Sequence, residues 1–413
     1  MAENTKGRSP FYPGQPIPVD LFTGRIGPLK RIMTRGVAQV AAGKPVTMFV
    51  QGEYGIGKSS LANYARAIAE SKEGSNLHGV YVTLGGASSL EGIGSAILEG
   101  FIHSGRYIPK RAQTIREWLE KYIAAKTLFD IDVDMKAVKR DALRIATPDG
   151  LLAFLKESIQ RLEETGVKGL FLILDEINGI TTNPQFAHFI KGIVDTNAVS
   201  RPPVPLLLML CGVEERRSEM ISIHPPVGRI FDVIEVEPMG DEEMRDFFTR
   251  AFGAVKIAVD PDAMDEMTFY SGGLPKIMHE IGDAAYYIDQ DNRIDRADAR
   301  SAIEQAAEEV GRKYVEPEVY DALKSKAYHS ILSKLARLNK TEFTRDELAA
   351  VLTFDETKKL DNFLRRLKTL NVIRQGEVAG EYAFNIRMYQ VYITLKTIHD
   401  EAPSAPRQNR SRS

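Results

Sequence analysis

Short apolar runs recur through the first half of the chain, and longer segments with helical periodicity separate them. The runs are Val46–Val50, Gly79–Leu84, Gly169–Leu174, Val204–Leu210 and Phe231–Val236. After the first run, Leu61, Ala65 and Ile68 have the i, i+4, i+7 spacing of one helix face. Strands without alternating polar residues are typical of parallel sheets that helices cover on both faces. The pattern therefore predicts an α/β domain with a parallel sheet.

A long insertion, residues 85–168, separates the second and third predicted strands. Thr114–Ala125, which contains the only tryptophan, Trp118, and Leu151–Leu162 are predicted to form amphipathic helices. Between them, Leu128–Met135 alternates apolar and acidic residues, which would place its carboxylates on one face of a strand. We interpret this face as the solvated side of an edge strand, with a metal site as the alternative.

A change in composition at Glu316-Pro317 follows a predicted linker helix, Arg296–Tyr314. The pattern beyond it predicts helices over Tyr328–Leu338, from Thr344 and from Asp355, then strands over Val372–Gln375 and Glu381–Phe384. The third of these helices carries Leu360, Phe363, Leu364, Leu367 and Leu370 on one face. Three helices and a β-hairpin in this order resemble a winged helix.

Composition narrows the class of protein. The chain has 413 residues, enough for two to three domains, and 43% of them are hydrophobic. Its formal net charge of −2 means that nucleic-acid contact would need a local basic patch. The single cysteine, Cys211, excludes an internal disulfide framework. No segment approaches the ~18 consecutive apolar residues of a membrane span, which predicts a cytoplasmic protein without membrane contact.

A glycine-rich loop joins the first strand to the first helix and has the spacing G-x-x-x-x-G-K-[ST]. Such a loop turns backbone N–H groups inward as an anion nest, and the following helix adds its positive N-terminal end. Lys58 is expected to reach the β- and γ-phosphates of a nucleotide, and the Ser59 hydroxyl to ligate Mg²⁺. The predicted nucleotide-binding residues of this loop are Gly52, Glu53, Tyr54, Gly55, Ile56, Gly57, Lys58, Ser59 and Ser60.

Two carboxylates, Asp175 and Glu176, end the most apolar strand. The carboxyl ends of parallel strands are where open α/β sheets bind their ligands. Asp175 is expected to hold Mg²⁺ through its water shell. Glu176 is placed to polarise a water for attack on the γ-phosphate, so it is the predicted general base. The Asp-Glu pair favours an NTP hydrolase over a kinase.

Further motifs make the chain resemble the AAA+ ATPases, in particular their origin-recognition/initiator branch and the related STAND NTPases. Phe22-Thr23-Gly24-Arg25 is similar to the box that lies against adenine in both groups. His224–Phe231 is similar to the segment that carries the arginine finger, which implies a catalytic role for Arg229 from a neighbouring subunit. Gly272–Lys276 resembles the G-x-P motif of STAND proteins, with Lys276 at the sensor-2 position. Phe22, Gly24, Arg25, Pro275 and Lys276 are thereby predicted to contact the nucleotide.

The resemblance covers roughly residues 18–310 and implies ATP as the nucleotide, ATP hydrolysis, and a homo-oligomer or a partner AAA+ subunit. It also implies the domain order, which is a flexible segment (1–17), an AAA+ α/β domain (18–240), a helical lid (241–315), a winged-helix-like domain (316–400) and a disordered tail (401–413). The sequence departs from the family at Cys211-Gly212, where sensor 1 has a polar residue, and at Lys276, where sensor 2 has arginine. Both departures bear on the expected rate of ATP hydrolysis and not on nucleotide binding.

The third helix of the C-terminal module carries basic residues off its apolar face, at Lys358, Lys359, Arg365, Arg366 and Lys368. A recognition helix would meet the major groove of double-stranded DNA there, although a solvated helix face gives the same pattern. Two functions remain open. One is an AAA+ ATPase whose nucleotide state controls assembly and DNA engagement through the winged helix. The other is a STAND-like nucleotide-dependent switch that scaffolds protein partners without binding DNA.

Overall fold

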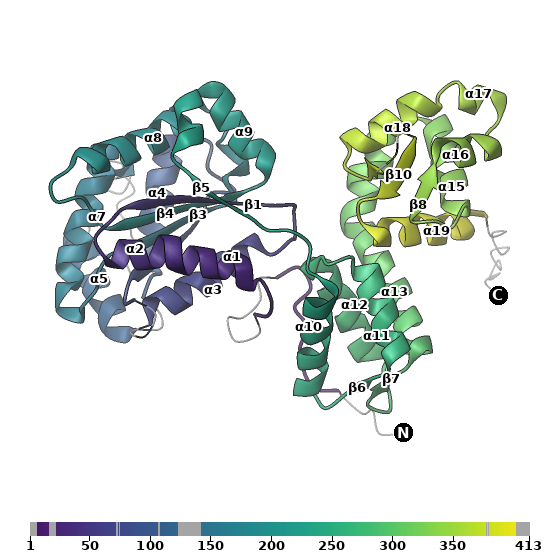
Figure 1. The fold of residues 1–413 in the computed structure, drawn as a ribbon, viewed down its shortest axis with the longest axis horizontal. Coiled ribbons are helices and arrows are strands. Elements are labelled where there is room, and N and C mark those ends of the chain that lie inside the picture. Colours follow the sequence, from purple (N-terminus) through teal and green to yellow (C-terminus); the bar gives the residue numbers. More distant parts are fainter. Residues whose placement is uncertain are drawn as a thin grey trace, which may run out of the picture. The chain divides into compact units, whose positions relative to one another are not determined.

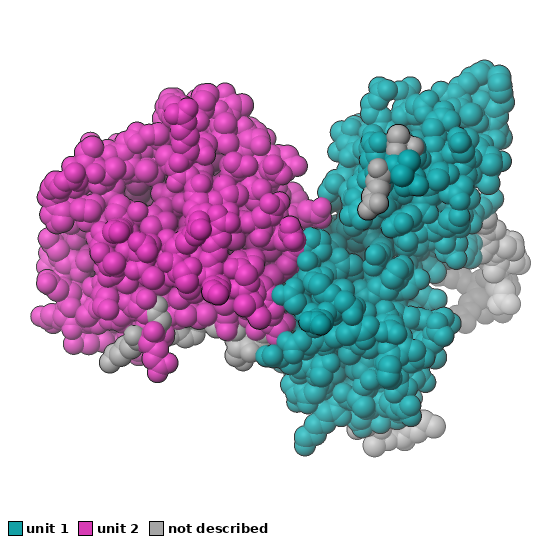
Figure 2. All heavy atoms as spheres, viewed as in Figure 1, with its two compact units in different colours: residues 1–15, 238–413 teal, residues 16–237 magenta. Residues whose placement is uncertain are grey.

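The computed structural model describes residues 6–15, 22–71, 73, 75–105, 108–122, 142–376, 378 and 380–401. The chain divides into two compact units, one of residues 16–237 and one of residues 1–15 with 238–413 (Figure 2). The acidic alternation of Leu128–Met135 and the predicted tail beyond Glu401 lie outside the described residues.

The unit of residues 16–237 is built on a parallel sheet whose strands follow the order β2-β3-β4-β1-β5. The strands are β1 Val46–Gln51, β2 His78–Thr83, β3 Leu170–Asp175, β4 Leu206–Gly212 and β5 Asp232–Glu235. Every residue of β3 and β4 is buried, because these strands lie inside the sheet and carry apolar side chains on both faces. The register pairs Thr83 with Asp175 and Gln51 with Gly212, so the carboxyl ends of all these strands meet at one edge.

Helices cover both faces of this sheet (Figure 1). Val80, Leu172 and Leu208 belong to the core on one face, which includes side chains of α4, α5, α7 and α8. Gly79 faces α3 on the other side, where an added Cβ would meet Arg66. The helices are α1 Ile26–Arg31, continued by η2 Ile32–Val37 and α2 Ala38–Ala41, then α3 Lys58–Glu70, α4 Leu90–Ile102, α5 Pro109–Tyr122, α7 Pro148–Leu162, α8 Pro184–Val199 and α9 Glu214–Ile223. Short 3₁₀ turns are η3 Glu163–Thr165, η4 Ile177–Gly179 and η5 Pro225–Arg229.

The second unit begins with a helical subdomain. Its helices are α10 Asp241–Ala254, α11 Pro261–Ser271, α12 Pro275–Ile288 and α13 Arg296–Val310, with a short parallel pair of strands, β6 Ala258–Val259 and β7 Arg293–Ile294. The helix α13 runs on into η6 Gly311–Tyr320 and α14 Asp321–Leu323, so Glu316-Pro317 lies within continuous helical chain. Tyr392 packs on this stretch, where a Cβ on Gly311 would clash with its ring.

The N-terminal residues 6–15 belong to the same subdomain. The Phe11 ring is 4% exposed and lies with its centroid 4.8 Å from that of Phe252. Gly282 leaves room for it, because a Cβ there would stand 2.2 Å from the Phe11 ring. The Tyr12 N–H donates to Nδ1 of His279 at 3.1 Å. The structure differs here from the expectation of a flexible segment, because an aromatic side chain fills a slot in the helical core.

The rest of the second unit contains the helices and strands predicted for this module, except that the third predicted helix, from Asp355, is divided into Phe354–Thr357 and Leu360–Thr369. The elements are α15 Lys326–Arg337, β8 Glu342–Thr344, α16 Arg345–Val351, α17 Phe354–Thr357, α18 Leu360–Thr369, β9 Ile373–Gln375, β10 Glu381–Phe384 and α19 Arg387–Glu401. The strands form an antiparallel sheet in the order β8-β10-β9. Thr344 caps α16 through its side chain, in a capping box with Glu347. The strand β8 and the helix α19 are additions that the sequence pattern did not predict.

Candidate active site

The loop between β1 and α3 has the backbone of an anion-binding nest. Gly57 precedes α3 with φ 97°, a left-handed conformation that only glycine adopts without strain. Gly52 directly follows β1 and packs closely against Val236, the first residue after β5. An added Cβ at Gly52 would lie 2.6 Å from the Val236 carbonyl oxygen. The 13-residue helix α3 begins at Lys58, so its positive N-terminal end faces the loop. The loop can therefore bind an anion through its backbone.

Lys58 lies over this loop. Its Nζ donates to the carbonyl oxygens of Gly52 at 2.8 Å and Glu53 at 2.7 Å, and it stands 5.7 Å from the centre of the Tyr54 ring. Burial lowers the pKa of Lys58, while the nearby Asp175 carboxylate acts in the opposite direction. A partly desolvated ammonium group interacts more strongly with an anion than a solvated one does. Lys58 is thus placed to bind a phosphate held in the loop.

The Asp175 carboxylate, 3% exposed, has a protein donor on each oxygen. Its Oδ1 accepts the N–H of Glu176 at 2.8 Å, and its Oδ2 accepts the hydroxyl proton of Tyr81. Tyr81 comes from the middle of β2, and the Ser59 hydroxyl at the start of α3 is also within hydrogen-bonding reach of its oxygen. Ser59, Tyr81 and Asp175 therefore border one small space at the carboxyl edge of the sheet.

Glu176 is exposed and has φ 54°, a left-handed conformation that costs a non-glycine residue on the order of 1 kcal/mol. This backbone turns its side chain toward the loop after β2. A Cβ added to Gly85 would stand 2.5 Å from Oε2 of Glu176. The carboxylate therefore lies against the backbone of Gly85.

The donors gathered here suit a magnesium ion. Mg²⁺ prefers oxygen ligands and is held by one or two protein groups together with phosphates and water. Ser59 and Asp175 offer a hydroxyl and a carboxylate, both of them oxygen donors. Among the described residues, no group of three or more His, Cys, Asp or Glu side chains could hold a metal by itself. The residues present fit an ion that arrives with a nucleotide, with Ser59 and Asp175 as its protein contacts.

Two arginines at this edge were not predicted from the sequence. Arg217 in α9 donates through Nε to Oε1 of Gln51 at 2.9 Å, at the end of β1. Arg216 pairs with Glu219 at 2.7 Å, and its pKa is raised by that hydrogen bond and by one to the Tyr54 hydroxyl. The sequence feature that could have indicated these arginines is their position in a helix that directly follows a central strand. They bring positive charge beside the loop, whereas β4 itself ends in Cys211 and Gly212. Burial raises the pKa of the Cys211 thiol.

The predicted adenine box packs beside the loop. The Phe22 ring stacks on Tyr64 of α3 with 4.4 Å between ring centroids. Arg25 has φ 60° and is 7% exposed, and its guanidinium donates to the carbonyl oxygen of Ile56 at 2.9 Å and to that of Glu237. Arg25 thus connects the loop, through Ile56, to Glu237 in the segment that follows β5. Its contact with adenine stays a prediction, as do those of Phe22 and Gly24.

The remaining predicted site residues belong to η5, to α12, and to the loop with the first turn of α3. Arg229 is exposed at the end of η5, and its action on a neighbouring subunit's nucleotide stays a prediction. Pro275 and Lys276 begin α12 in the other unit, where Lys276 Nζ lies 4.5 Å from the centre of the Tyr314 ring. Gly55, Ile56 and Ser60 belong to the loop and to the first turn of α3, as expected.

The basic residues predicted to contact DNA are exposed along α18 and just before it. They are Lys358, Lys359, Arg365, Arg366 and Lys368. Acidic neighbours reduce this charge, since Lys358 lies 3.5 Å from Asp355 and Arg345 pairs with Asp361 at 2.9 Å. These exposed residues form the basic surface of α18, and Asp355 partly neutralises it at Lys358.

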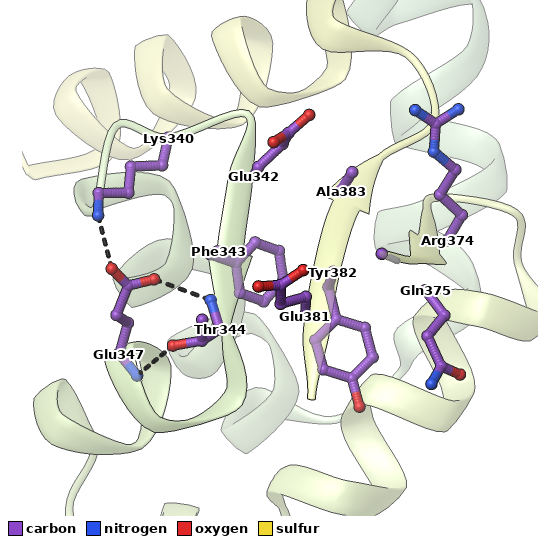
Figure 3. A pocket seen from close by; sticks show the side chains of 11 residues that line it. Lys340, Glu342, Phe343, Thr344, Glu347, Arg374, Gln375, Glu381, Tyr382 and Ala383 are labelled. Carbon is purple, nitrogen blue, oxygen red and sulfur yellow. Dashed lines mark hydrogen bonds and ion pairs between the residues drawn. The ribbon is translucent and has the colours of Figure 1, made fainter. Parts of the chain in front are cut away.

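A groove over the three-stranded sheet of this module has a different charge (Figure 3). Glu342 and Glu381 line it opposite Arg374, and Lys340 is held by Glu347 at 2.6 Å. Carboxylates outnumber the cations among these side chains, which disfavours phosphate binding in the groove. The groove therefore does not extend the basic surface of α18.

None of the helices among the described residues combines the length and apolar character of a membrane span. No protein-family model and no curated protein matches the sequence. Solved structures do resemble it. The Walker-type ATPase PABY2304 of Pyrococcus abyssi is 16% identical with a TM-score of 0.54, over 90% of this chain and 96% of that one. The Aeropyrum pernix ORC2 protein, in its ADPNP–ADP complexes, is 14% identical with a TM-score of 0.58, over 92% of this chain and 95% of that one.

At these identities the likenesses concern the fold alone. Together with the strand order β2-β3-β4-β1-β5, they confirm the predicted α/β fold class, a parallel sheet with helices on both faces as in these two ATPase and ORC2 structures. They do not bear on the STAND-like part of the resemblance, which stays a prediction. The site residues likewise rest on the geometry described above.

Proposed function

We propose that the protein binds ATP with Mg²⁺ and hydrolyses the β–γ phosphoanhydride bond. One observation carries the proposal. The Tyr81 hydroxyl contacts both Ser59 of the loop and Asp175 of β3, so the anion nest and the acidic pair face the same space. A phosphate in the nest would bring its terminal group beside the carboxylates, which is the arrangement that water attack on the γ-phosphate needs.

Each residue has a distinct task in this reaction. The backbone from Gly52 to Lys58 binds the phosphate chain, and the Lys58 ammonium stabilises the charge that develops on it. Ser59 and Asp175 hold Mg²⁺, which neutralises the phosphate oxygens when it is bound. Glu176, whose carboxylate is exposed at the same edge, orients and deprotonates the attacking water. Arg229 of a neighbouring copy would stabilise the leaving charge, as an arginine finger does.

Two substitutions test the proposal. Lys58→Ala should weaken binding of a fluorescent ATP analogue about 10- to 100-fold, because a charge-assisted hydrogen bond contributes about 1.5–3 kcal/mol. Glu176→Gln should bind the analogue with unchanged affinity but fail to release phosphate. Lys44→Ala, at an exposed residue before β1, is the matched control for loss of a lysine. Equal affinity of the Lys58→Ala protein and the control would refute nucleotide binding at this loop.

We further propose that nucleotide state controls assembly and DNA engagement, with the basic side chains of α18 against DNA phosphates. Support comes from the exposure of Lys359 and Arg365 on the recognition-helix position of a winged-helix-like module. Duplex binding should weaken steeply with salt, and a Lys359→Glu/Arg365→Glu protein should have a shallower salt dependence, by about one unit of log–log slope per lost phosphate contact. Light scattering with ADP and with an ATP analogue tests assembly.

A second function has its own support. Cys211 and Gly212 end β4 without a polar side chain toward the phosphates, which favours slow hydrolysis and a long-lived ATP state. Acidic side chains also reduce the charge of the module that would meet DNA. These features suit a nucleotide-dependent switch that assembles protein partners. Absence of duplex binding at low salt, with ATP binding intact, would favour this switch over the DNA-linked ATPase.

A further inference from the structure

Tyr81 occupies an unusual place between the groups expected to hold the metal ion. It lies on β2, and its side chain extends on the face of the sheet that α3 covers, as Gly79 does on the same strand. Its hydroxyl donates to Oδ2 of Asp175 and lies within hydrogen-bonding reach of the Ser59 hydroxyl. The phenol oxygen thus lies between the loop and β3, hydrogen-bonded to Asp175 and close to the Ser59 hydroxyl.

The direction of these hydrogen bonds follows from the chemistry of the groups. An ionised carboxylate only accepts hydrogen bonds, so the proton between Tyr81 and Asp175 belongs to the tyrosine. A tyrosine phenol has an ordinary pKa of about 10, so it carries its proton at neutral pH. Its oxygen lone pairs remain available to accept the proton of Ser59. Ser59 is therefore placed to donate its proton to Tyr81, and Tyr81 donates its own to Asp175.

This direction matters when Ser59 binds a metal. A serine hydroxyl ligates Mg²⁺ through an oxygen lone pair, and its proton must then point away from the ion. Tyr81 supplies the acceptor for that proton. By donating to Asp175 Oδ2, while the Glu176 N–H holds Oδ1 at 2.8 Å, Tyr81 also fixes the orientation of the carboxylate. Groups that orient metal ligands in this way contribute about 10- to 100-fold to metal affinity.

We propose that Tyr81 is a positioning residue for Mg²⁺, which orients the Ser59 hydroxyl and the Asp175 carboxylate at once. The inference rests on the proposed function, because it concerns the ion that accompanies the nucleotide. It adds a residue from β2, a strand from which the sequence motifs predicted no site residue. Tyr81 acts through its two neighbours, so its effect should appear in metal dependence and not in nucleotide binding without metal.

The test compares Tyr81→Phe with the unaltered protein and with Tyr122→Phe, which removes a phenol hydroxyl from α5 in the same unit. Binding of a fluorescent non-hydrolysable ATP analogue is titrated in EDTA and at rising Mg²⁺ concentration. For Tyr81→Phe, the Mg²⁺ concentration at half-maximal enhancement should rise about tenfold, with affinity in EDTA unchanged within about twofold. Tyr122→Phe should behave as the unaltered protein does. Electron paramagnetic resonance of Mn²⁺ in the same complex gives a second readout of metal affinity.

A double-mutant cycle locates the effect. Because Tyr81 acts partly through Ser59, Tyr81→Phe should raise the Mg²⁺ midpoint by a smaller factor in a Ser59→Ala background than in the unaltered protein. An unchanged Mg²⁺ midpoint in Tyr81→Phe would overturn the inference, and so would a lower midpoint, which would mean that the phenol competes with the metal. Mg²⁺-independent analogue binding by the unaltered protein would instead overturn the proposed function.

Discussion

Gly85 offers a way to move the Glu176 carboxylate without changing its chemistry. A Cβ on Gly85 would stand 2.5 Å from Oε2 of Glu176, whereas ordinary van der Waals contact begins at 3.4 Å. In Gly85→Ala the carboxylate must therefore retreat by about 0.9 Å. Gly85 is not among the glycines with positive φ, so alanine fits its backbone conformation. The substitution should move one functional group and leave the loop in place.

The expected effect on turnover follows from this displacement. A misplacement of about 1 Å can reduce the rate of an enzyme about 100-fold, because the reacting groups no longer meet in the productive geometry. A 100-fold loss corresponds to about 2.7 kcal/mol in the activation free energy. Nucleotide affinity should be unchanged, since Glu176 contacts the attacking water and not the phosphates. Single-turnover phosphate release and analogue binding measure the two quantities separately.

The adjacent glycine provides the matched control. A Cβ on Gly86 would meet nothing within 4 Å, so Gly86→Ala changes the same loop without touching the carboxylate. We expect Gly86→Ala to retain the turnover of the unaltered protein. Equal turnover of Gly85→Ala and Gly86→Ala, in proteins with equal melting temperatures, would refute the assignment of Glu176 as the general base at this position.

Three further changes have outcomes that the structure determines. Phe11→Ala should lower the free energy of unfolding of its unit by about 3–5 kcal/mol, measured in urea, because it empties the slot at Gly282. Gly52→Ala should abolish analogue binding with the fold retained, as seen by circular dichroism, because its Cβ would strike the Val236 carbonyl oxygen. Burial lowers the pKa of His78 to about 3. As the pH drops below about 6.5, the unfolded chain takes up a proton on this histidine and the folded chain does not, so the free energy of unfolding should fall by about 1 kcal/mol per pH unit. The urea midpoint should lose this slope in His78→Gln.

The fold was predictable where the sequence pattern is strong. The apolar runs of β3 and β4 indicate buried strands, and the glycine loop and Asp175-Glu176 place two strand ends on the same edge of the sheet. The strand β8 is only Glu342–Thr344, too short for a period-two pattern to identify it. Helix α19 has apolar side chains on more than one face because it packs within its unit, so it lacks a clear amphipathic period.

Only the site residues that belong to sequence motifs could be predicted. Lys58, Ser59 and Asp175 belong to local patterns whose spacing the sequence displays. Tyr81 lies in a strand whose sequence reads as ordinary β-structure, and its contact with Asp175 depends on the register between β2 and β3. Arg216 comes near Tyr54 through the course of α9 after β4. Such residues are brought to the site by tertiary structure, and no local pattern marks them.

The chain that leaves β5 connects several of these features. The Val236 N–H donates to the Gln51 carbonyl at 2.9 Å, and the Val236 carbonyl closes over Gly52. The next residue, Glu237, accepts a hydrogen bond from Arg25, which also holds the Ile56 carbonyl.

Within the second unit, the Met239 N–H donates to the Gly273 carbonyl at 2.9 Å, two residues before Pro275 begins α12. The stretch Val236–Met239 is therefore hydrogen-bonded at its first residue to Gln51, the last residue of β1, and at its last residue to Gly273.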